Sequence, residues 1–230
     1  AQRPEIVYHI ASCAREGAST LQPVKICQTN MMASMNVIEL GIKYGMKRLV
    51  FTSSMSVYGN GQHKPPFHEN MKPAPVDPYG QNKAAIEAII GQLAEVHKFE
   101  YVILRPHNCF AERASLTDLY RNVISIFCQR IRREEPLDIF GKNFKRAFSY
   151  MGDCIEPMVK AAFSDKVIGE IINIGGTEAI TIEELAEAVI AEFPEYKKPG
   201  INHIPPRPHE VAAAWSTVEK SIKLLDFKEE

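Results

Sequence analysis

The sequence predicts an α/β fold built on a parallel, doubly wound sheet. Three short apolar runs, at residues 5–12, 48–54 and 101–106, are typical of buried strands, and helical patterns separate them. Strands that alternate with helices pair in parallel, because each helix carries the chain back across one face of the sheet. Open sheets of this kind bind ligands beyond the carboxyl ends of their strands, so the residues after each run are the first candidates for a site.

The first half of the chain follows this alternation. The first apolar run ends in His9-Ile10-Ala11-Ser12, and a helix is expected from about Val24 to Tyr44, where a glycine provides a stop signal. The second run ends in two hydroxyl side chains, Ser53 and Ser54, which a buried strand would deliver to the sheet edge. A loop rich in Gly and Pro then covers 58–76.

The next helix carries a pair of side chains that could take part in catalysis. Asp77 suits the N-cap position and Pro78 the first helical turn. Tyr79 and Lys83 are four residues apart, so they share one side of the helix. A nearby ammonium favours the phenolate and lowers the pKa of a tyrosine towards the range of a general base. The same spacing also occurs in exposed pairs without chemistry, and the hydroxyls at 53 and 54 favour the catalytic interpretation.

The second half of the chain contains fewer strand signals. A late buried strand at 170–176 ends in a glycine turn, and Thr181-Ile182-Glu183-Glu184 has the pattern of a capping box at the start of an amphipathic helix. A Pro-rich loop at 205–210 precedes a last helix that runs to Phe227.

Composition excludes several classes of protein. The chain has 230 residues, 45% hydrophobic content and a net charge of −1 with scattered Lys and Arg, so neither a nucleic-acid nor a membrane surface is expected. The five cysteines lack Cys-x-x-Cys spacing, which favours reduced thiols and a soluble cytoplasmic protein. The seven histidines are scattered, so no metal site is expected.

Two motifs together resemble a known superfamily. Thr-Ser-Ser-Met-Ser-Val-Tyr-Gly at 52–59, followed by Tyr-Gly-Gln-Asn-Lys at 79–83, is similar to the signature of the extended short-chain dehydrogenase/reductases, and among them to nucleotide-sugar epimerases of the UDP-glucose 4-epimerase type. The resemblance implies a Rossmann-like fold, NAD as cofactor, and Ser54, Tyr79 and Lys83 as catalytic residues.

The resemblance also assigns the residues that would hold the cofactor and the substrate. The cofactor residues it implies are Ile10, Ala11, Asn30, Ser53, Tyr79, Lys83, Pro106 and His107. The substrate residues it implies are Ser54, Asn108, Asn122, Arg146 and Arg207, with the two arginines on the diphosphate. Asn122 could instead be a solvated helix cap. The residues after Asn108 and around Lys142 depart from the family pattern, so those loops are expected to differ in shape.

The resemblance divides the chain into two domains and reveals one departure. Residues 1–107 and about 153–176 match the dinucleotide-binding domain, and residues 108–152 and 177–230 match a smaller α+β substrate domain. The glycine-rich turn with which relatives begin has no counterpart, so the matched Rossmann domain is N-terminally truncated. We expect the chain to be the remainder of a longer protein rather than a natural truncation, since an uncovered parallel sheet is costly.

These expectations lead to a specific activity. The resemblance implies NAD-dependent epimerisation of a nucleoside-diphosphate sugar at C4 through a 4-keto intermediate, with UDP-glucose and UDP-galactose as the expected pair. Alternatives are a reductase, decarboxylase or dehydratase of the same superfamily, or a non-catalytic sugar-nucleotide-binding remnant. The dehydratases place Asp-Glu after the catalytic hydroxyl, whereas this chain has Met55-Ser56. A homodimer is expected, with Met31, Met32, Met35 and Ile86 on the outer helix faces.

Overall fold

The main sheet of the computed structural model has four parallel strands. They are β1 (Ile6–His9), β2 (Arg48–Thr52), β3 (Glu100–Pro106) and β8 (Ile171–Ile174), in the order β1-β2-β3-β8. The structure describes residues 3–59, 63–116, 118, 122–206 and 211–229. The α/β fold and the parallel sheet predicted from the sequence are confirmed.

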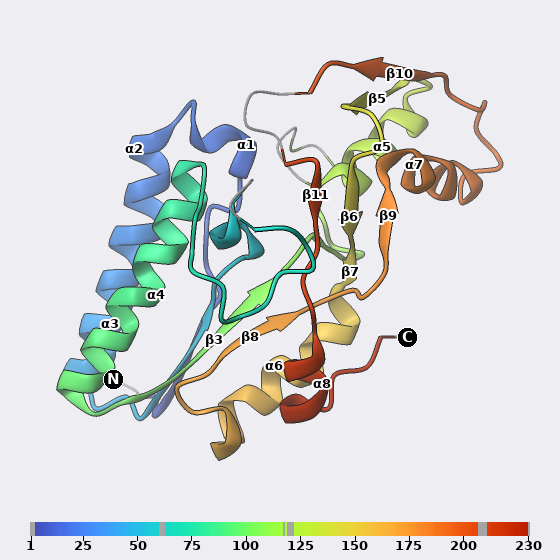
Figure 1. Ribbon diagram of the computed structural model, residues 1–230. Coiled ribbons are helices and arrows are strands. Elements are labelled where there is room, and N and C mark those ends of the chain that lie inside the picture. Colours follow the sequence, from blue (N-terminus) through green and yellow to red (C-terminus); the bar gives the residue numbers. More distant parts are fainter. Residues whose placement is uncertain (1–2, 60–62, 117, 119–121, 207–210, 230) are drawn as a thin grey trace.

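One face of this sheet is covered by the helices that connect its first three strands (Figure 1). They are α1 (Glu16–Ser19), α2 (Pro23–Ile26), the π-helical segment η1 (Cys27–Met32), α3 (Ala33–Lys43) and α4 (Pro78–His97). The predicted helix at 24–44 thus contains a π-helical stretch that its apolar pattern did not indicate. The core beneath these helices includes Phe51, Ile86 and Ile90, each fully buried.

Helix α4 begins as its sequence predicts. The side chain of Asp77 accepts a hydrogen bond from the Gly80 amide at 2.9 Å, and Pro78 occupies the first turn. Two turns further on, the Glu87 carboxylate accepts two hydrogen bonds from the Arg105 guanidinium on β3, at 2.9 and 2.6 Å. This buried ion pair joins the helix to the sheet directly below the carboxyl ends of the strands.

The opposite face of the sheet is covered by α6 (Met151–Phe163) and α8 (Glu219–Leu225), so the sheet is doubly wound (Figure 1). Their shared core contains Val102, Met158, Leu225 and Phe227. The domain division at 177–230 stays a prediction, and the packing adds that the last helix of that range lies on the main sheet.

A smaller part of the chain lies beyond the carboxyl ends of the main strands (Figure 1). Its elements are α5 (Val123–Arg132), α7 (Ile182–Ala191) and the short strands β4 (Cys109–Phe110), β5 (Leu137–Phe140), β6 (Lys145–Ala147), β7 (Ser149–Tyr150), β9 (Ala179–Thr181), β10 (Ile201–Ile204) and β11 (Ala213–Ala214). Strand β6 lies between β11 and β9, and β10 pairs with β5. The predicted capping box at Thr181 and Glu184 is present in full.

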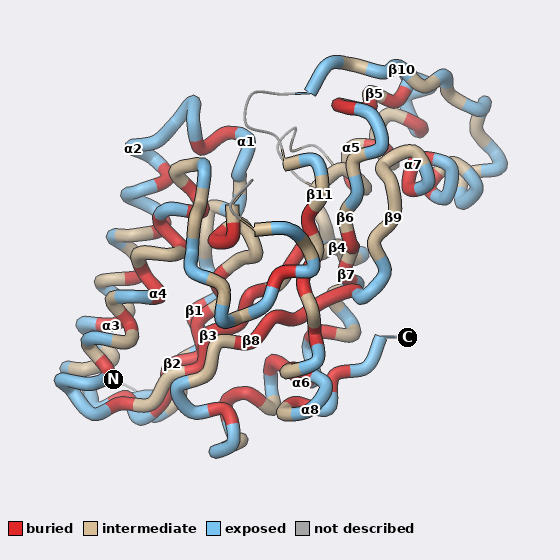
Figure 2. Tube along the Cα trace, in the orientation of Figure 1, coloured by how far each residue is buried: buried red, intermediate tan, exposed pale blue. Residues whose placement is uncertain are grey.

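The burial pattern shows which expected surface residues are exposed. Figure 2 shows buried residues concentrated along the main strands. Ile86 is fully buried under α4, so its assignment to an outer face was wrong: it packs on Phe51 and its neighbours. Met32 is 56% exposed, whereas Met31 and Met35 pack partly against the core.

Two features are absent from the described residues. None of the helices in that part of the chain is both long and apolar enough to span a bilayer. The same residues contain no group of three or more His, Cys, Asp or Glu side chains placed to share a metal ion.

Candidate active site

The parallel strands bring the predicted site residues to one edge of the sheet. Ile10 and Ala11 follow β1, Ser53 and Ser54 follow β2, and His107 and Asn108 follow β3. All four strands of the sheet run in the same direction, so these segments meet at its carboxyl edge. Most of the predicted site therefore gathers in one place through sheet topology.

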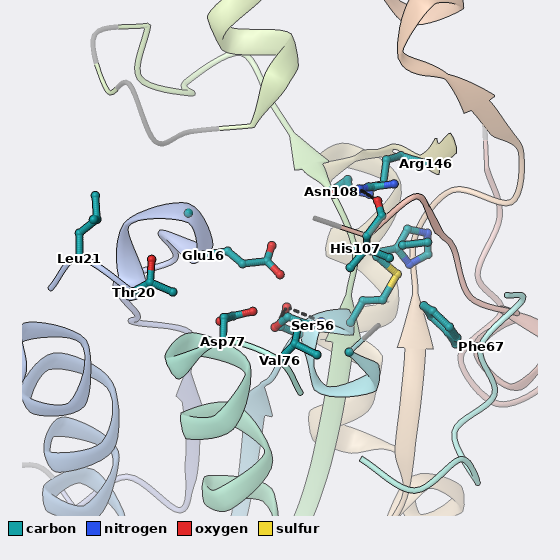
Figure 3. Close-up of a pocket in the computed structure, with 16 residues that line it drawn as sticks. Glu16, Thr20, Leu21, Ser56, Phe67, Val76, Asp77, His107, Asn108 and Arg146 are labelled. Atoms are coloured by element: carbon teal, nitrogen blue, oxygen red, sulfur yellow. Dashed lines mark hydrogen bonds between the residues drawn. The ribbon is translucent and has the colours of Figure 1, made fainter. Parts of the chain in front are cut away.

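A cavity of about 600 Å³ lies above this edge, between the main sheet and the smaller part of the chain (Figure 3). Its lining comes from five regions: α1 and its surroundings, the segment after β2, the loop before α4 with the start of that helix, the segment after β3, and the smaller part of the chain. The lining residues are Glu16, Gly17, Thr20, Leu21, Ser54, Met55, Ser56, Gly59, Phe67, Val76, Asp77, His107, Asn108, Arg146, Val211 and Ala214. This volume is in the range of small-molecule sites.

Ser54 and Tyr79 form a hydroxyl pair beside the cavity. Ser54 caps a short 3₁₀ helix, where its Oγ accepts the Ser56 amide at 3.1 Å and the Ser56 hydroxyl at 2.9 Å. Tyr79 is 7% exposed on the first turn of α4, and the Ser54 side chain lies near enough to its phenol to lower the phenol pKa. The two hydroxyls predicted to be catalytic therefore lie near each other.

The ionisation of Tyr79 differs from the expectation. Burial raises the pKa of its phenol well above the usual value, the nearby Ser54 hydroxyl lowers it, and the negative charges of Glu16 and Asp77 raise it further. The sequence predicted a pKa lowered by the nearby Lys83 ammonium. Burial dominates in this arrangement, and the spacing of two residues on a helix cannot reveal burial.

Lys83 lies below the hydroxyl pair and is almost fully enclosed. Its Nζ donates to the Thr52 carbonyl at 2.7 Å and stands 4.8 Å from the centre of the Phe51 ring and 5.9 Å from that of Tyr79. Burial lowers the pKa of the ammonium to about 8, and the charge of Glu87 opposes that shift. The group is thus a cation at neutral pH that sits close to its own titration point.

The residues around β2 fit a polar cofactor. In the described part of the chain, the buried hydroxyls of Thr52 and Ser53 have no hydrogen-bond partner. Buried polar groups are nearly always paired, so such atoms at a ligand-binding edge favour a polar group that is supplied by a ligand. The Lys83 ammonium, with three donors, lies next to them. Thr52, Ser53 and Lys83 therefore form a group of polar side chains with capacity to bind a ligand at this edge.

Asn30 holds the loop after β1 through hydrogen bonds to its backbone. It lies in the π-helical segment, where its Oδ1 accepts from the Cys13 amide at 2.7 Å and its Nδ2 donates to the Cys13 carbonyl at 3.3 Å. The loop that starts with Ile10 and Ala11 is therefore fixed by this amide. Asn30 positions the predicted cofactor segment through Cys13, and π-helical turns are frequent at functional sites.

Pro106 ends β3, and His107 lines the cavity with both ring nitrogens engaged in hydrogen bonds. Nε2 lies 2.8 Å from the Gly176 carbonyl, which can only accept, so Nε2 carries the proton and Nδ1 accepts from Ser216 at 3.0 Å. Burial lowers the pKa of the imidazole, in keeping with this neutral tautomer. His107 thereby connects the end of β3 to Gly176, which follows β8, and to Ser216, which precedes α8.

The predicted substrate residues divide into two groups. Asn108 and Arg146 line the cavity; Asn108 donates to the Ala147 carbonyl at 2.8 Å, and Arg146 donates to the carbonyls of Lys145 and Val211. Asn122 caps α5 and donates to the Cys109 carbonyl at 2.6 Å, and it is not among the lining residues. Arg207 lies outside the described residues.

Sequence analysis missed two acidic residues of the cavity wall. Glu16 belongs to α1, and Asp77, identified only as a helix cap, faces the cavity as well as its own helix (Figure 3). Glu16 follows the first strand at the same sheet edge as Ser54. The rule that ligands bind at strand ends could have drawn attention to it.

Comparison with protein families decides the classification. A model of the NAD dependent epimerase/dehydratase family matches residues 1–175. The chain belongs to this family. Membership confirms the predicted superfamily and NAD as the cofactor, and it agrees with the pairing of Ser54 and Tyr79 at the sheet edge.

Relatives within the epimerase/dehydratase family differ in activity. The chain is 30% identical to UDP-glucuronate 4-epimerase of Thermodesulfobacterium geofontis over 97% of its own length and 67% of the relative. It is 29% identical to UDP-N-acetyl-alpha-D-glucosaminuronate decarboxylase of Bacillus cytotoxicus, covering 80% of this chain and 58% of that one. The chain thus spans about two thirds or less of the length of these curated relatives.

A solved structure agrees with the fold in detail. The crystal structure of UDP-glucose 4-epimerase with UDP-glucose from Thermotoga maritima superimposes with a TM-score of 0.92 at 28% identity. The match covers all of this chain and 73% of that chain. The family fold therefore extends over the main sheet and the smaller part alike.

Proposed function

We propose that the protein interconverts nucleoside-diphosphate sugars by epimerisation at C4, with UDP-glucose and UDP-galactose as the pair. The observation that carries this proposal is the closeness of Ser54 and Tyr79 beside a cavity that Ser54 and Arg146 both line. A hydroxyl pair can hold and deprotonate a sugar hydroxyl, and a guanidinium suits a diphosphate. The 4-epimerases among the family relatives support the same reaction.

Each residue has a distinct task in this mechanism. Ser54 binds the C4 hydroxyl of the sugar and passes its proton to the Tyr79 oxygen. This step requires the phenolate, which burial disfavours and which the positive charges of Lys83 and of bound NAD⁺ would have to stabilise. Lys83 remains charged below about pH 8 and provides the positive charge that favours the phenolate. NAD, when bound, supplies the acceptor and then the donor of hydride at C4. Thr52, Ser53 and Lys83 are the groups that would hold its ribose.

Epimerisation also requires the oxidised sugar to present its other face. We assign the grip on the diphosphate to Arg146 and predict the same role for Arg207, so that the sugar alone turns. The cavity of about 600 Å³ leaves room for such a rotation. Apolar lining from Met55, Phe67 and Val76 favours this, because it does not tether one orientation of the ring.

Another activity of the family is the first alternative. A decarboxylase oxidises the same sugar carbon, and one of the relatives named above is a decarboxylase. A dehydratase is disfavoured because Met55 and Ser56 follow Ser54, where water elimination needs an acid and a base.

We also propose a homodimer formed through the helical face of α2, α3 and α4. The exposed apolar side chains there are Val24, Met32, Leu40 and Val96. A shallow apolar depression at Pro23, Cys27 and Met31 lies among them. Exposed apolar patches of this kind mark interaction surfaces. A cytoplasmic location is part of the same proposal.

Turnover of UDP-glucose tests the function. The full-length gene product, supplied with NAD⁺, is expected to form UDP-galactose, and Tyr79→Phe is expected to lower kcat by at least about a thousandfold because it removes the proton acceptor. The matched control is Tyr44→Phe, an exposed tyrosine at the end of α3, which should retain parental kcat. Undiminished turnover by Tyr79→Phe would contradict the assigned base. Absence of turnover with NAD⁺ bound would rule out UDP-glucose as substrate.

A further inference from the structure

The cavity has opposite charges at its two ends. Glu16 on α1 and Asp77 at the start of α4 face it from one side, and Arg146 lies on the other, beside Asn108 (Figure 3). Asp77 is fixed in position, since its carboxylate accepts from the Gly80 amide at 2.9 Å and from the Ser19 hydroxyl at 3.3 Å. The acidic end is therefore a built part of the wall.

The acidic end coincides with the reacting end. Ser54 and Ser56 belong to the same part of the cavity as Asp77. The charges of Glu16 and Asp77 both act on the phenol of Tyr79, which places them within electrostatic reach of the reacting hydroxyl. If Arg146 binds the diphosphate, the sugar ring extends towards these two carboxylates.

We propose that Glu16 and Asp77 make the sugar end of this cavity selective for nucleotide sugars whose ring carries no carboxylate. The inference rests on the proposed function, and it names the substrate class of the same site. Neutral hexoses donate hydroxyl hydrogen bonds to carboxylates, whereas a hexuronic acid brings a third negative charge into an enclosed space. Electrostatic exclusion of this kind creates specificity by repulsion.

The proposal separates this chain from a relative that it resembles. UDP-glucuronate 4-epimerase, at 30% identity, acts on a sugar with such a carboxylate. Overall similarity therefore favours a uronate substrate no less than a neutral one. The charge of the cavity wall favours the neutral one.

The decisive measurement is a ratio of two specificity constants. The full-length gene product with NAD⁺ is assayed with UDP-glucose and with UDP-glucuronate, and kcat/KM for the neutral sugar is expected to be at least about a hundredfold higher. In Glu16→Gln and in Asp77→Asn the ratio is expected to fall by about tenfold each. Each substitution removes one negative charge, and a change of about tenfold is the size expected for the repulsion between two partly screened charges. Asparagine is a good N-cap, so Asp77→Asn retains the start of α4.

A matched control separates this effect from general changes in charge. Glu39 lies on the exposed side of α3, away from the cavity, and Glu39→Gln is expected to leave the ratio at its parental value. A purely structural effect of Glu16→Gln would change both specificity constants together and leave their ratio constant.

Each outcome bears on the inference separately from the function. Comparable turnover of both sugars, or a ratio that neither substitution changes, would overturn it while the epimerase proposal stands. If neither sugar is turned over, the epimerase proposal fails, and calorimetric binding of the two nucleotide sugars decides the inference. A lower Kd for UDP-glucose than for UDP-glucuronate, with a smaller difference in Glu16→Gln, would support the inference. Equal Kd values for the two sugars would overturn it.

Discussion

Lys83 carries a charge where little water reaches it, and this has a consequence for stability. Only 2% of its surface is exposed, and burial lowers its pKa from 10.5 to about 8. Below pH 8 the folded protein therefore bears the full cost of a buried ammonium. Between pH 8 and 10.5 the unfolded chain binds more protons at this site than the folded one, so the contribution of Lys83 to stability rises with pH.

Lys83→Met is expected to convert this cost into a measurable pH dependence. The free energy of unfolding of the variant minus that of the parent should be largest below pH 8. This difference should decline by about 3 kcal/mol as pH rises to 10.5. Loss of the hydrogen bond to the Thr52 carbonyl lowers the free energy of unfolding of the variant by the same amount at every pH, so it does not change the pH dependence. Urea unfolding at several pH values measures the difference. Lys43→Met, at an exposed lysine of α3, should show no such trend.

A flat difference between Lys83→Met and parent would contradict the burial of a charged Lys83. Activity of the variant should be lost at all pH values. The combination of higher stability at neutral pH and lost catalysis is expected where a charge is retained for function.

At the scale of single residues, the sequence indicated which residues form the site better than it indicated the burial and charge around them. Tyr79 and Lys83 could be paired by their spacing, and Ser54 by its place after a strand. The direction of the Tyr79 pKa could not be predicted, because it depends on burial and on Glu16, which approaches from a different element. His107 was predicted to be near the cofactor, but its neutral tautomer follows only from the positions of Gly176 and Ser216.

Between elements, a buried polar link is formed by the ion pair of Glu87 and Arg105. It joins α4, which carries Tyr79 and Lys83, to β3, and both side chains are almost fully buried. The Arg105 guanidinium also stacks 4.8 Å from the centre of the Tyr58 ring. Removing one partner of such a pair leaves a buried charge without compensation.

Glu87→Gln is therefore expected to destabilise the protein by about 3 to 5 kcal/mol. The double variant Glu87→Gln/Arg105→Met should recover part of that loss, because it removes the orphaned charge. Glu95→Gln, two turns further along α4 and exposed, is the matched control and should change stability by less than about 0.5 kcal/mol. Chemical unfolding of the four proteins completes the comparison. If Glu87→Gln lowered stability no more than Glu95→Gln does, the Arg105 guanidinium would have to be hydrated.

The elements of the main sheet were predictable and their irregularities were not. The start of α4, the strands at 48–52 and 100–106, and the capping box of α7 follow from local signals that agree with the final fold. The π-helical turn at 27–32 has no sequence signature, since its apolar pattern is that of an ordinary helix. The short strands that pair across long separations, such as β5 with β10, depend on tertiary packing.

At the scale of the whole molecule, the cavity lies between two bodies of packed residues. The main sheet and its helices form one, and the core of Phe127, Ile139 and Val189 forms the other. The sequence indicated both bodies through the resemblance to a family. The sequence does not predict that α1 lines the same cavity as the smaller part of the chain, because no motif at 12–22 marks it.

A ligand bound between these bodies is expected to stabilise the whole fold. With NAD⁺ present, UDP at about a hundred times its Kd contributes about 2.7 kcal/mol, which raises Tm by about 5 to 10 °C for a chain of this size. Arg146→Ala removes the guanidinium proposed to bind the diphosphate. At the same UDP concentration we expect its Tm shift, measured from its own unliganded value, to fall to about half, since Kd rises about tenfold.

The neighbouring residue provides the control for this experiment. Lys145 lies on the same strand as Arg146 but is exposed and outside the cavity lining, so Lys145→Ala should retain the full shift. If both substitutions reduced the shift equally, the effect would be one of general positive charge, which salt would screen. A specific loss in Arg146→Ala, retained at high salt, would instead place the diphosphate at the basic end and thereby direct the sugar towards Ser54, Tyr79 and the two carboxylates.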